Sequence, residues 1–428
     1  MEEHLMTVNR ICMDGFTGAL MAAESFSDGR AVLHGPGGCR SYHALMTARC
    51  YPRAEPADFK KYSKQYFFGN PRMPCTFINE DSYINGSEKK LVECIPIICD
   101  TDDNFSVFIS SPGAALIGDN ITDIIERCGY KDRAMAIGES LISQPFPSSY
   151  DHTIRSIIEW KEPKKKDTVP KSVNILGLPV SSKDWKDALA DLTSILGDMG
   201  ITVISSPGAG CSSADLEGST AAEYNICVCP EYCKRTSAYY EKEYGIPTIF
   251  SKMGAPVGFD AVEYWAENIA KAMNADAANV NARISRAKER TFKWMNGSFL
   301  SRRVKYSRFT ITADSSVAYP LTKWLYEYLC MLPVSVSVDP GEDSHLVSSL
   351  VGFLDSAGLK DAWNSDPAQS VDFLFADGHT ADTQKMIGSC GKGIDIAMPS
   401  LTNVNFIPRP IFGIAGCMYI LDEIFGSL

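Results

Sequence analysis

Short runs of β-branched and apolar residues alternate with helical stretches along most of this chain, and this alternation limits its fold more than any other feature. The runs are continuous rather than strictly alternating between polar and apolar residues. Continuous apolar strands separated by helices are typical of parallel sheets that are covered on both faces. The expected strands are residues 107–110, 173–178, 201–205, 224–229, 309–313, 334–338, 371–376 and 394–398.

Length and composition set the number of domains. At roughly 150 residues per domain, a chain of 428 residues holds about three. A lysine- and proline-rich stretch at 160–173 is typical of a solvated linker, and a basic helical segment at 278–308 marks a softer break. We therefore predict an α/β fold of three Rossmann-like domains with mostly parallel sheets around a central cleft, over residues 1–165, 172–290 and 303–428.

The charge balance argues against a nucleic acid or a membrane as partner. Forty-one basic and fifty-two acidic residues give a net charge of −11, which disfavours binding to phosphates or anionic lipids. No apolar run approaches the roughly 18–20 residues of a transmembrane helix, and the first residues are acidic and polar, unlike a signal peptide. We therefore expect a cytoplasmic protein whose fourteen cysteines are metal ligands or core residues rather than disulfides.

Two common nucleotide-binding motifs are missing from the sequence. Gly391 and Lys392 are followed by Gly393 instead of the serine or threonine of a P-loop, so the chain is not expected to hydrolyse ATP by that route. The turn at 208–210 lacks the third glycine of a dinucleotide-binding fingerprint. In parallel α/β sheets, ligands bind beyond the carboxyl ends of the strands, and the loops there are where chemistry is expected.

The segment from Cys12 to Cys39 carries the strongest chemical signal. Cys39 ends the stretch RAVLHGPGGC, in which Gly35, Gly37 and Gly38 would let the backbone approach a bulky ligand and direct amide N–H groups at it. An iron–sulfur cluster is such a ligand, and a helix N-terminus after Cys39 would stabilise its negative charge. From these residues alone, a glycine-rich turn beside an incidental buried thiol is an equally good interpretation.

Three segments resemble the nitrogenase component 1 family. The sequence CMDGFTGAL at 12–20, followed by HGPGGCRSY at 34–42, is similar to the family's N-terminal cluster-binding region. The stretch at 108–121, which ends in LIGDNI, resembles its third cluster-binding segment, and EKEYGIP at 241–247 resembles a stretch of its second domain. The resemblance extends over essentially the whole chain.

The resemblance implies a shared [4Fe–4S] cluster. Cys12 and Cys39 match two of the three cysteines with which each nitrogenase subunit holds its share of the electron-relay cluster, whereas the third position falls at Pro112, which cannot bind iron. The neighbouring residues at 110–111 are serines, which would be weak ligands. Because a [4Fe–4S] cluster normally takes four protein ligands, we predict that two chains meet at the cluster. A homodimer is the simplest case, and a paralogous second subunit is the alternative.

A second group of cysteines comprises Cys227, Cys229 and Cys233. By the resemblance, Cys229 falls where nitrogenase α subunits anchor their substrate-reducing metallocofactor, but the histidine that holds the other end of that cofactor aligns with Phe412. Three interpretations stay open: a different cluster, with or without Cys211; one retained ligand at Cys229; or core thiols, which pack well after buried strands. Cys229 is therefore a candidate metal ligand of a second iron–sulfur or metallocofactor centre.

Four further side chains lie in or near these motifs. His34 is expected to position the backbone of the glycine turn, and His43 to face solvent or donate a proton. Asp119 is expected to cap a helix or bond the turn. His379 is either a proton donor to a ligand in the cleft or a satisfied loop residue.

The resemblance implies a catalytic component of a two-component, ATP-dependent reductase. A separate P-loop iron–sulfur ATPase, similar to the nitrogenase iron protein, would deliver low-potential electrons to the bridging cluster, and a small-molecule substrate in the central cleft would receive them. Two alternatives stay open: a scaffold on which an iron–sulfur metallocofactor is assembled or transferred, and a metal-free α/β binding protein.

Overall fold

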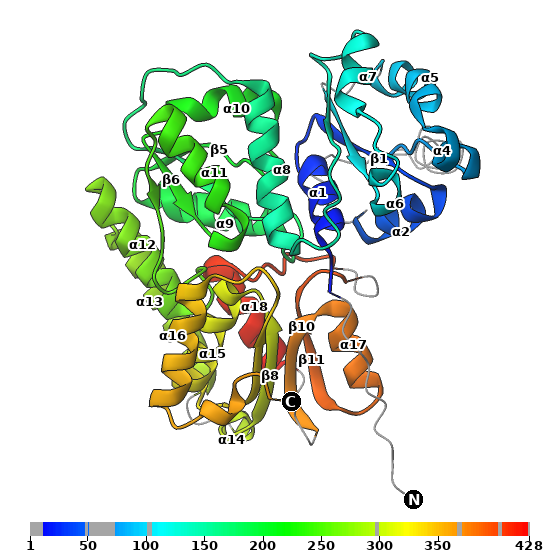
Figure 1. Ribbon diagram of the computed structural model, residues 1–428. Coiled ribbons are helices and arrows are strands. Elements are labelled where there is room, and N and C mark those ends of the chain that lie inside the picture. The colour runs from blue at the N-terminus through cyan, green and yellow to red at the C-terminus, as the bar shows by residue number, and fades with distance from the viewer. Residues whose placement is uncertain are drawn as a thin grey trace, which may run out of the picture.

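Three parallel sheets, each in its own lobe, build the molecule (Figure 1). The computed structural model describes residues 12–47, 50, 73–100, 105–295, 299–365, 370–400 and 405–426. All eight strands expected from the sequence are present, and the predicted α/β class with parallel sheets is confirmed. The domain boundaries stay predictions. No helix among the described residues has the length and apolarity needed to span a bilayer.

The first sheet has the order β1-β2-β3. Its faces alternate along the strands, as the pleat requires: Leu33, Val107 and Ile109 face the main core, whereas Val32 and Phe108 face a smaller separate cluster beneath α5 and α7. Its elements are α1 (Gly15–Glu24), β1 (Gly29–His34), α2 (Gly37–Thr47), α4 (Glu80–Asn85), α5 (Glu88–Cys99), β2 (Phe105–Ser110), α6 (Pro112–Ala115), α7 (Ile121–Arg127), β3 (Ala134–Ile137) and α8 (Phe146–Lys161).

The second sheet has the order β5-β4-β6-β7 and is fully parallel. Its elements are β4 (Ser172–Leu176), α9 (Trp185–Asp198), β5 (Thr202–Ser205), α10 (Ser213–Gly218), β6 (Tyr224–Cys227), α11 (Lys234–Tyr239), β7 (Thr248–Ile249), α12 (Phe259–Met273) and α13 (Ala278–Met295). A short 3-10 turn at 230–232 and a π-helical turn at 240–244 flank α11.

The third sheet has the order β11-β10-β8-β9. Its elements are α14 (Phe299–Val304), β8 (Arg308–Ala313), α15 (Ser315–Leu329), β9 (Leu332–Val338), α16 (Ser344–Ser356), β10 (Val371–Asp377), α17 (Gly378–Met386), β11 (Cys390–Ala397) and α18 (Gly413–Phe425). The C-terminal helix α18 returns to the second lobe, where the Ala415 amide donates to Asp191 of α9 at 3.0 Å.

Helix α8 joins the first lobe to the second, and it lies between them in Figure 1. It packs on α1 and α11. Cys233 directly precedes α11, and its side chain makes no capping hydrogen bond to that helix. The N-terminus of α11 is capped instead by Asp151 of α8. Its carboxylate accepts from the amides of Arg235 at 2.6 Å and Thr236 at 3.0 Å, so the two lobes share a capped helix end.

Candidate functional site

The predicted glycine turn connects β1 to α2. The Gly35 amide donates to Thr76 Oγ1 at 3.1 Å, which fixes the start of the turn. Helix α2 begins at Gly37, so Cys39 lies in its first turn. The helix was expected to begin after Cys39, but it begins two residues before that cysteine, because Gly37 and Gly38 already adopt helical geometry. Cys39 thus lies at a helix N-terminus, where backbone N–H groups without intrahelical partners and the helix dipole favour negative charge.

The three glycines of the turn serve different purposes. A Cβ at Gly35 would lie 2.5 Å from Ser111 Oγ, and a Cβ at Gly37 would lie 2.8 Å from the Phe77 ring. Both glycines are therefore explained by packing of the chain on itself. Gly38 is exposed, and a Cβ there would meet nothing within 4 Å. The surface beside Cys39 is thus open at Gly38.

His34 ties the turn to two distant segments. Its Nδ1 lies 3.0 Å from Thr76 Oγ1, and its Nε2 lies 3.2 Å from Ser87 Oγ. Ser87 in turn donates to Asp119 Oδ2 at 2.5 Å. Burial lowers the pKa of His34 to about 4, against a smaller opposing effect of Asp119, so the ring is neutral at pH 7. This network is consistent with the predicted role of His34 in positioning the backbone of the glycine turn. Of the two roles expected for Asp119, the hydrogen bond to the turn region is made through Ser87, whereas α7 is capped by Asn120.

Helices α1 and α2, which respectively follow Cys12 and contain Cys39, contact each other. Thr17 Oγ1 lies 3.3 Å from His43 Nδ1, and the Phe16 and His43 rings meet edge to face at 4.9 Å. Cys39 lies one helical turn before His43 and so shares its face of α2, while Cys12 lies three residues before the start of α1. Cys12 is exposed and Cys39 is half-buried. His43 itself is buried, so the expectation that it faces solvent is wrong.

The described residues of one chain do not complete a metal site by themselves. Pro112 starts α6, and Ser111 caps that helix by accepting from the Ala114 amide. Within the described ranges, no three His, Cys, Asp or Glu side chains come together as a potential metal site. A cluster at Cys12 and Cys39 would therefore need ligands from elsewhere.

The second cysteine group is buried in the core beneath β4. Cys227, Cys229 and Cys233 are each at most 2% exposed. The sulfurs of Cys227 and Cys233 lie 3.3 Å apart, and the Cys229 amide donates to the Gly177 carbonyl at 3.0 Å. Burial raises the pKa of the Cys227 and Cys229 thiols well above the usual value. These thiols have the surroundings of core residues, and the role of Cys229 as a metal ligand stays a prediction.

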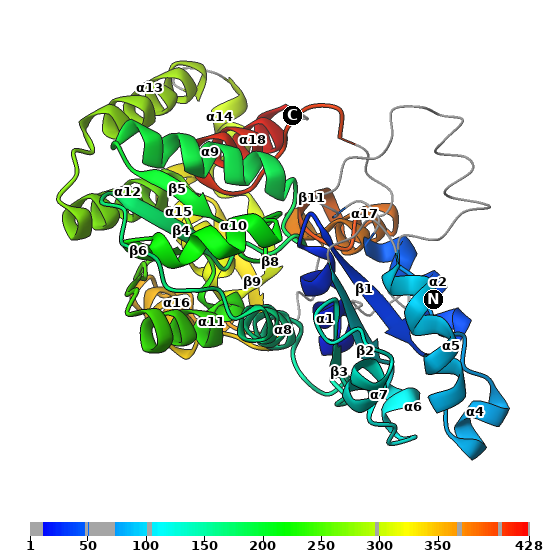
Figure 2. The same ribbon diagram turned by 90° about the horizontal axis from the view of Figure 1, so that it is seen from above.

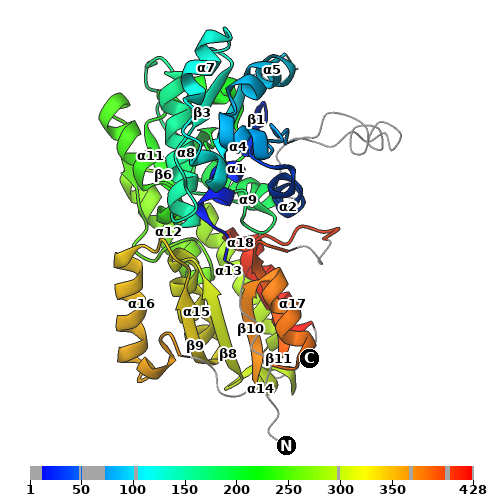
Figure 3. The same ribbon diagram turned by 45° about the vertical axis from the view of Figure 1, so that its right-hand side comes forward.

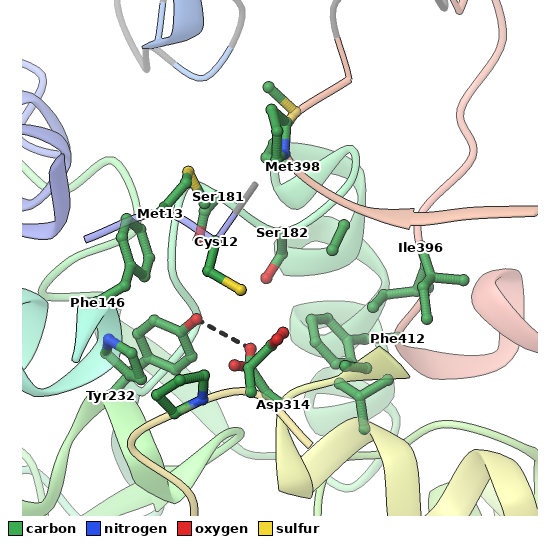
Figure 4. Close-up of a pocket in the computed structure, with 18 residues that line it drawn as sticks. Cys12, Met13, Phe146, Ser181, Ser182, Tyr232, Asp314, Ile396, Met398 and Phe412 are labelled. Atoms are coloured by element: carbon green, nitrogen blue, oxygen red, sulfur yellow. Dashed lines mark hydrogen bonds between the residues drawn. The ribbon is translucent and has the colours of Figure 1, made fainter. Parts of the chain in front are cut away.

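A cavity of about 70 Å³ lies where the three lobes meet. Figure 4 shows the Cys12 side chain pointing into it, and Tyr232 donating its hydroxyl hydrogen to Asp314 at 2.9 Å. Phe412 lines the cavity, whereas Cys229 and His379 do not. Its walls come from residues 12–13 and 146–147 of the first lobe, 181–182 and 232 of the second, and 313, 314, 317, 339, 340, 396–399, 411 and 412 of the C-terminal part.

Two carboxylates of this cavity were missed by the sequence analysis. Asp314 directly follows β8 and Asp339 directly follows β9, and these strands are neighbours in the third sheet. The Asp339 amide donates to the Ala313 carbonyl at 3.0 Å, which holds the two strand ends together. The rule that ligands bind at the carboxyl ends of strands, applied to the predicted strands 309–313 and 334–338, would have found both.

The sequence profile of nitrogenase component 1 type oxidoreductases matches residues 15–428. The chain belongs to this family. A subunit of the light-independent protochlorophyllide reductase of Trichormus variabilis is 23% identical over 331 residues, which cover 72% of this chain and 60% of that protein. Its counterpart in Acidiphilium rubrum is 29% identical over 119 residues, which cover 28% of this chain and 23% of that protein. This family member thus spans less than two thirds of those curated relatives.

Solved nitrogenase structures share the fold of this family member. The structure titled "Nitrogenase Cp1 at pH 6.5" superposes with a TM-score of 0.77 at 14% sequence identity, and the match covers 100% of this chain and 94% of that chain. A second, at pH 5, gives a TM-score of 0.67 at 15% identity over 98% of this chain and 90% of that chain. At such low identity the match concerns the fold alone, and it agrees with the predicted arrangement of Rossmann-like sheets.

Proposed function

We propose that this chain is the catalytic component of a two-component reductase, in which Cys12 and Cys39 hold half of a [4Fe–4S] cluster shared with a second subunit. The observation that carries the proposal is the accessibility of these two thiols. Cys12 is exposed and Cys39 is half-buried, whereas the cysteines after β6 are buried. A thiol that binds a cluster shared between two subunits must reach the surface of its own subunit, where the second subunit can approach it.

The residues around Cys39 fit an anionic cluster. Cys39 lies in the first turn of α2, where backbone N–H groups and the helix dipole favour negative charge, and Gly38 leaves open space beside it. When bound, the cluster would store one low-potential electron. The chain would contribute two thiolates through Cys12 and Cys39, and a fixed turn held through His34 and Thr76.

The surface near Cys39 supports a protein partner. The apolar side chains of Phe77, Ile84 and Leu116 are 49%, 81% and 87% exposed. The segment of Phe77 adjoins the glycine turn, and the segments of Ile84 and Leu116 adjoin each other. The Phe77 ring lies against Gly37, and the Tyr83 hydroxyl lies 2.9 Å from the position of a Cβ at Gly113, three residues before Leu116. Figure 2 shows α2, α4 and α6 together at the outer end of the first lobe. A second copy of this chain would supply the two missing thiolates, and a paralogous subunit is the alternative.

Electrons would come from a separate P-loop iron–sulfur ATPase, since the sequence has no P-loop of its own. The substrate would occupy the cavity between the lobes. The Cys12 side chain points into that cavity (Figure 4), so a ligand there would lie close to the cluster. Phe146, Ile411 and Phe412 would exclude water, and Asp314, held by Tyr232, would orient the ligand.

The proposed reaction does not use the candidate second centre at Cys229. Its thiol lies in the core and outside the cavity lining, and by the family resemblance Phe412 stands where a histidine would hold such a centre. No step of the proposed reaction therefore passes through Cys229. The cluster shared through Cys12 and Cys39 is sufficient for the electron transfer.

Anaerobic reconstitution with iron and sulfide tests the proposal. Wild type is expected to bind about four irons per two chains, and Cys12→Ala and Cys39→Ala are expected to lose nearly all of it. Cys330→Ser, which changes another exposed cysteine, is the matched control and should keep the cluster. Retention of iron and of the cluster's EPR signal in Cys39→Ala would refute the proposed ligand set.

The same preparation can be used to decide whether the protein acts as a reductase or as an assembly scaffold. ATP-dependent turnover of a small-molecule substrate with the partner ATPase is expected of a reductase. Transfer of the cluster to another apoprotein without turnover would instead support the scaffold.

A further inference from the structure

We propose that the surface around the C-terminal end of α13 docks on membranes that contain anionic lipids. This inference goes beyond the proposed reductase and does not depend on it, since the surface belongs to the second and third lobes. Figure 2 shows α13 and α2, the helix that contains Cys39, on opposite sides of the molecule. The inference rests on a local excess of positive charge, on cations without partners and on exposed aromatic side chains.

The positive charge of this surface contrasts with the rest of the chain. Residues 278–308 contain nine lysine and arginine residues and a single acidic residue, Glu289, so the segment carries a charge of +8. The whole chain has a net charge of −11, which leaves −19 for the remaining residues. The overall charge disfavours an anionic partner, but electrostatic interactions are largely screened beyond about 8 Å at physiological ionic strength. The local charge therefore dominates at this surface.

Two cations of the segment fix α13 to the second lobe. Arg283 pairs with Asp198 of α9 at 2.5 Å, and Lys288 pairs with Glu263 of α12 at 2.9 Å. Five other cations are exposed, and within the described part of the chain none of them makes a hydrogen bond or an ion pair: Arg286, Arg290, Lys293, Arg302 and Lys305. Because neighbouring side chains do not neutralise these five charges, they are available to an anionic partner.

Three exposed aromatic side chains lie among these five cations, and the eight residues together are called the basic face. Phe292, Trp294 and Tyr306 are 60%, 75% and 72% exposed. Arg290 and Trp294 are four residues apart in α13 and therefore lie on one side of that helix. Phe292 and Trp294 are separated by about 200° around the helix. Since both are exposed, this end of α13 protrudes into solvent.

The two parts of the basic face meet at the C-terminal end of α15. In α13, Thr291 Oγ1 lies 3.1 Å from the hydroxyl oxygen of Tyr328, which is in the last turn of α15. After α14, the Tyr306 amide donates to the carbonyl of Cys330, the residue that follows α15, at 2.8 Å. Tyr306 has a φ of +65°, which bulky residues rarely adopt, and this hydrogen bond helps to hold it there. The end of α13 and the turn after α14 thus form one surface.

A membrane with anionic lipids matches this surface better than other anionic partners do. Lysine and arginine side chains are attracted to its negative surface potential, and tryptophan and tyrosine favour the headgroup layer, where one end of the ring is apolar and the other wet. A protruding helix end can enter this fluid layer. Single-stranded nucleic acid instead follows a positively charged groove, and a folded acidic protein needs a surface complementary in shape to the protruding end.

Co-sedimentation of the full chain with lipid vesicles tests the proposal. Vesicles of phosphatidylcholine with about 40% phosphatidylglycerol supply the anionic surface, and vesicles of phosphatidylcholine alone are the neutral control. At about 50 mM salt, we expect at least about tenfold tighter binding to the anionic vesicles. This difference should disappear at about 500 mM salt, because salt screens the attraction.

Variants of the basic face locate the binding surface. The double variant Arg290→Gln with Lys293→Gln should weaken binding to anionic vesicles at least about tenfold, because each removed charge loses its attraction to the membrane. Trp294→Ala keeps every charge and should weaken binding about fivefold, because the ring no longer enters the headgroup layer. The matched control, Lys165→Gln with Lys166→Gln, changes two exposed lysines outside the basic face and alters the net charge equally. It should bind like wild type. All five side chains are exposed, so the fold is expected to be kept.

Several results would overturn the proposal: equal binding to anionic and neutral vesicles, no binding to either, unchanged binding in both basic-face variants, or an equal loss in the lysine control. Tighter binding of single-stranded poly-dT or of polyglutamate than of anionic vesicles, at equal concentrations of negative charge, would also overturn it. The basic face would then belong to a nucleic acid or an acidic protein. Because sedimentation needs no cluster, the iron assay decides separately whether the proposed function holds.

Discussion

The two cysteine groups of this chain end in different surroundings. Cys39 of the first group and Cys229 of the second each follow a parallel strand, and each lies near a glycine whose Cβ position shows how much space is left. Beside Cys39, a Cβ at Gly38 would meet nothing, whereas at Gly177 it would lie 2.3 Å from the Cys229 carbonyl oxygen. The first group is therefore open to a ligand, and the second is filled by the chain itself.

The position of each strand in its sheet contributes to the difference. Strand β1, which leads to Cys39, is the last strand of its sheet and is paired on its outer side by the short segment around Cys75, whereas β6, which leads to Cys227, lies between β4 and β7. A turn after an edge strand can project outward, and Figure 3 shows α2 at the outside of the molecule. A turn after a central strand is covered by neighbours on both sides. Cysteine spacing alone does not distinguish a ligand from a core residue.

Thiol labelling should show the largest contrast between the two groups. In a brief iodoacetamide pulse on the native cluster-free chain at pH 8, we expect Cys12 and Cys39 to react at least about 100-fold faster than Cys227 and Cys229. Burial excludes the reagent and raises the pKa of both Cys227 and Cys229, so little thiolate forms. Peptide mapping by mass spectrometry measures the rates. Similar labelling rates for both groups in the native protein would contradict the proposed difference in accessibility. As a control, all four cysteines should react at equal rates in denaturant.

Substitution of the two glycines should affect the stability of the protein to different extents. Gly177→Ala should lower the free energy of unfolding by about 3 kcal/mol or more, because Gly177 has a φ of +74° and its new Cβ would clash with backbone. Gly38→Ala should change it by less than about 0.5 kcal/mol. Urea unfolding followed by circular dichroism compares the two. A Gly177→Ala chain as stable as wild type would contradict the close packing over Cys229.

The pH dependence of stability should report on the glycine turn. Because the folded pKa of His34 is about 4 and the ordinary value is 6.5, the unfolded chain takes up a proton over this interval that the folded chain does not. Stability should therefore fall as the pH drops from 6.5 towards 4, with a contribution from His34 of about 2 kcal/mol between pH 7 and pH 5.

Urea titrations at the two pH values measure this contribution. His34→Gln should flatten the decline, and His345→Gln, which changes an exposed histidine, should leave it as in wild type. An equal decline in His34→Gln and wild type would contradict a buried neutral ring in the turn.

The sequence predicts the strands well because each is a compact apolar run. Three strands are not among the eight expected ones. Strand β1 (GRAVLH) was noted only as part of the stretch that ends at Cys39, and β3 (AMAI) and β7 (TI) were not predicted, since runs of four and two residues carry little pattern. The turn at Gly35 and Cys39 was found from its motif. Its anchor at Ser87 was not, because Ser87 is 53 residues from His34 and nothing in its own segment signals the contact.

The burial of the individual cysteines could also be learned only from the structure. From the sequence, both Cys39 after β1 and Cys229 after β6 were candidate metal ligands, and their different burial could not be predicted, because the order of strands in each sheet is a long-range property. Asp314 and Asp339 are the opposite case. Both were missed, although the predicted strand ends would have been enough to find them.

The central claim is that one cluster joins two chains through Cys12 and Cys39 of each. Anaerobic native mass spectrometry of the reconstituted protein tests it directly. The account predicts a complex of two chains with a single [4Fe–4S] cluster, and its loss when both chains carry Cys39→Ala. A single chain that retains a complete cluster, or a dimer with one cluster in each chain, would contradict it.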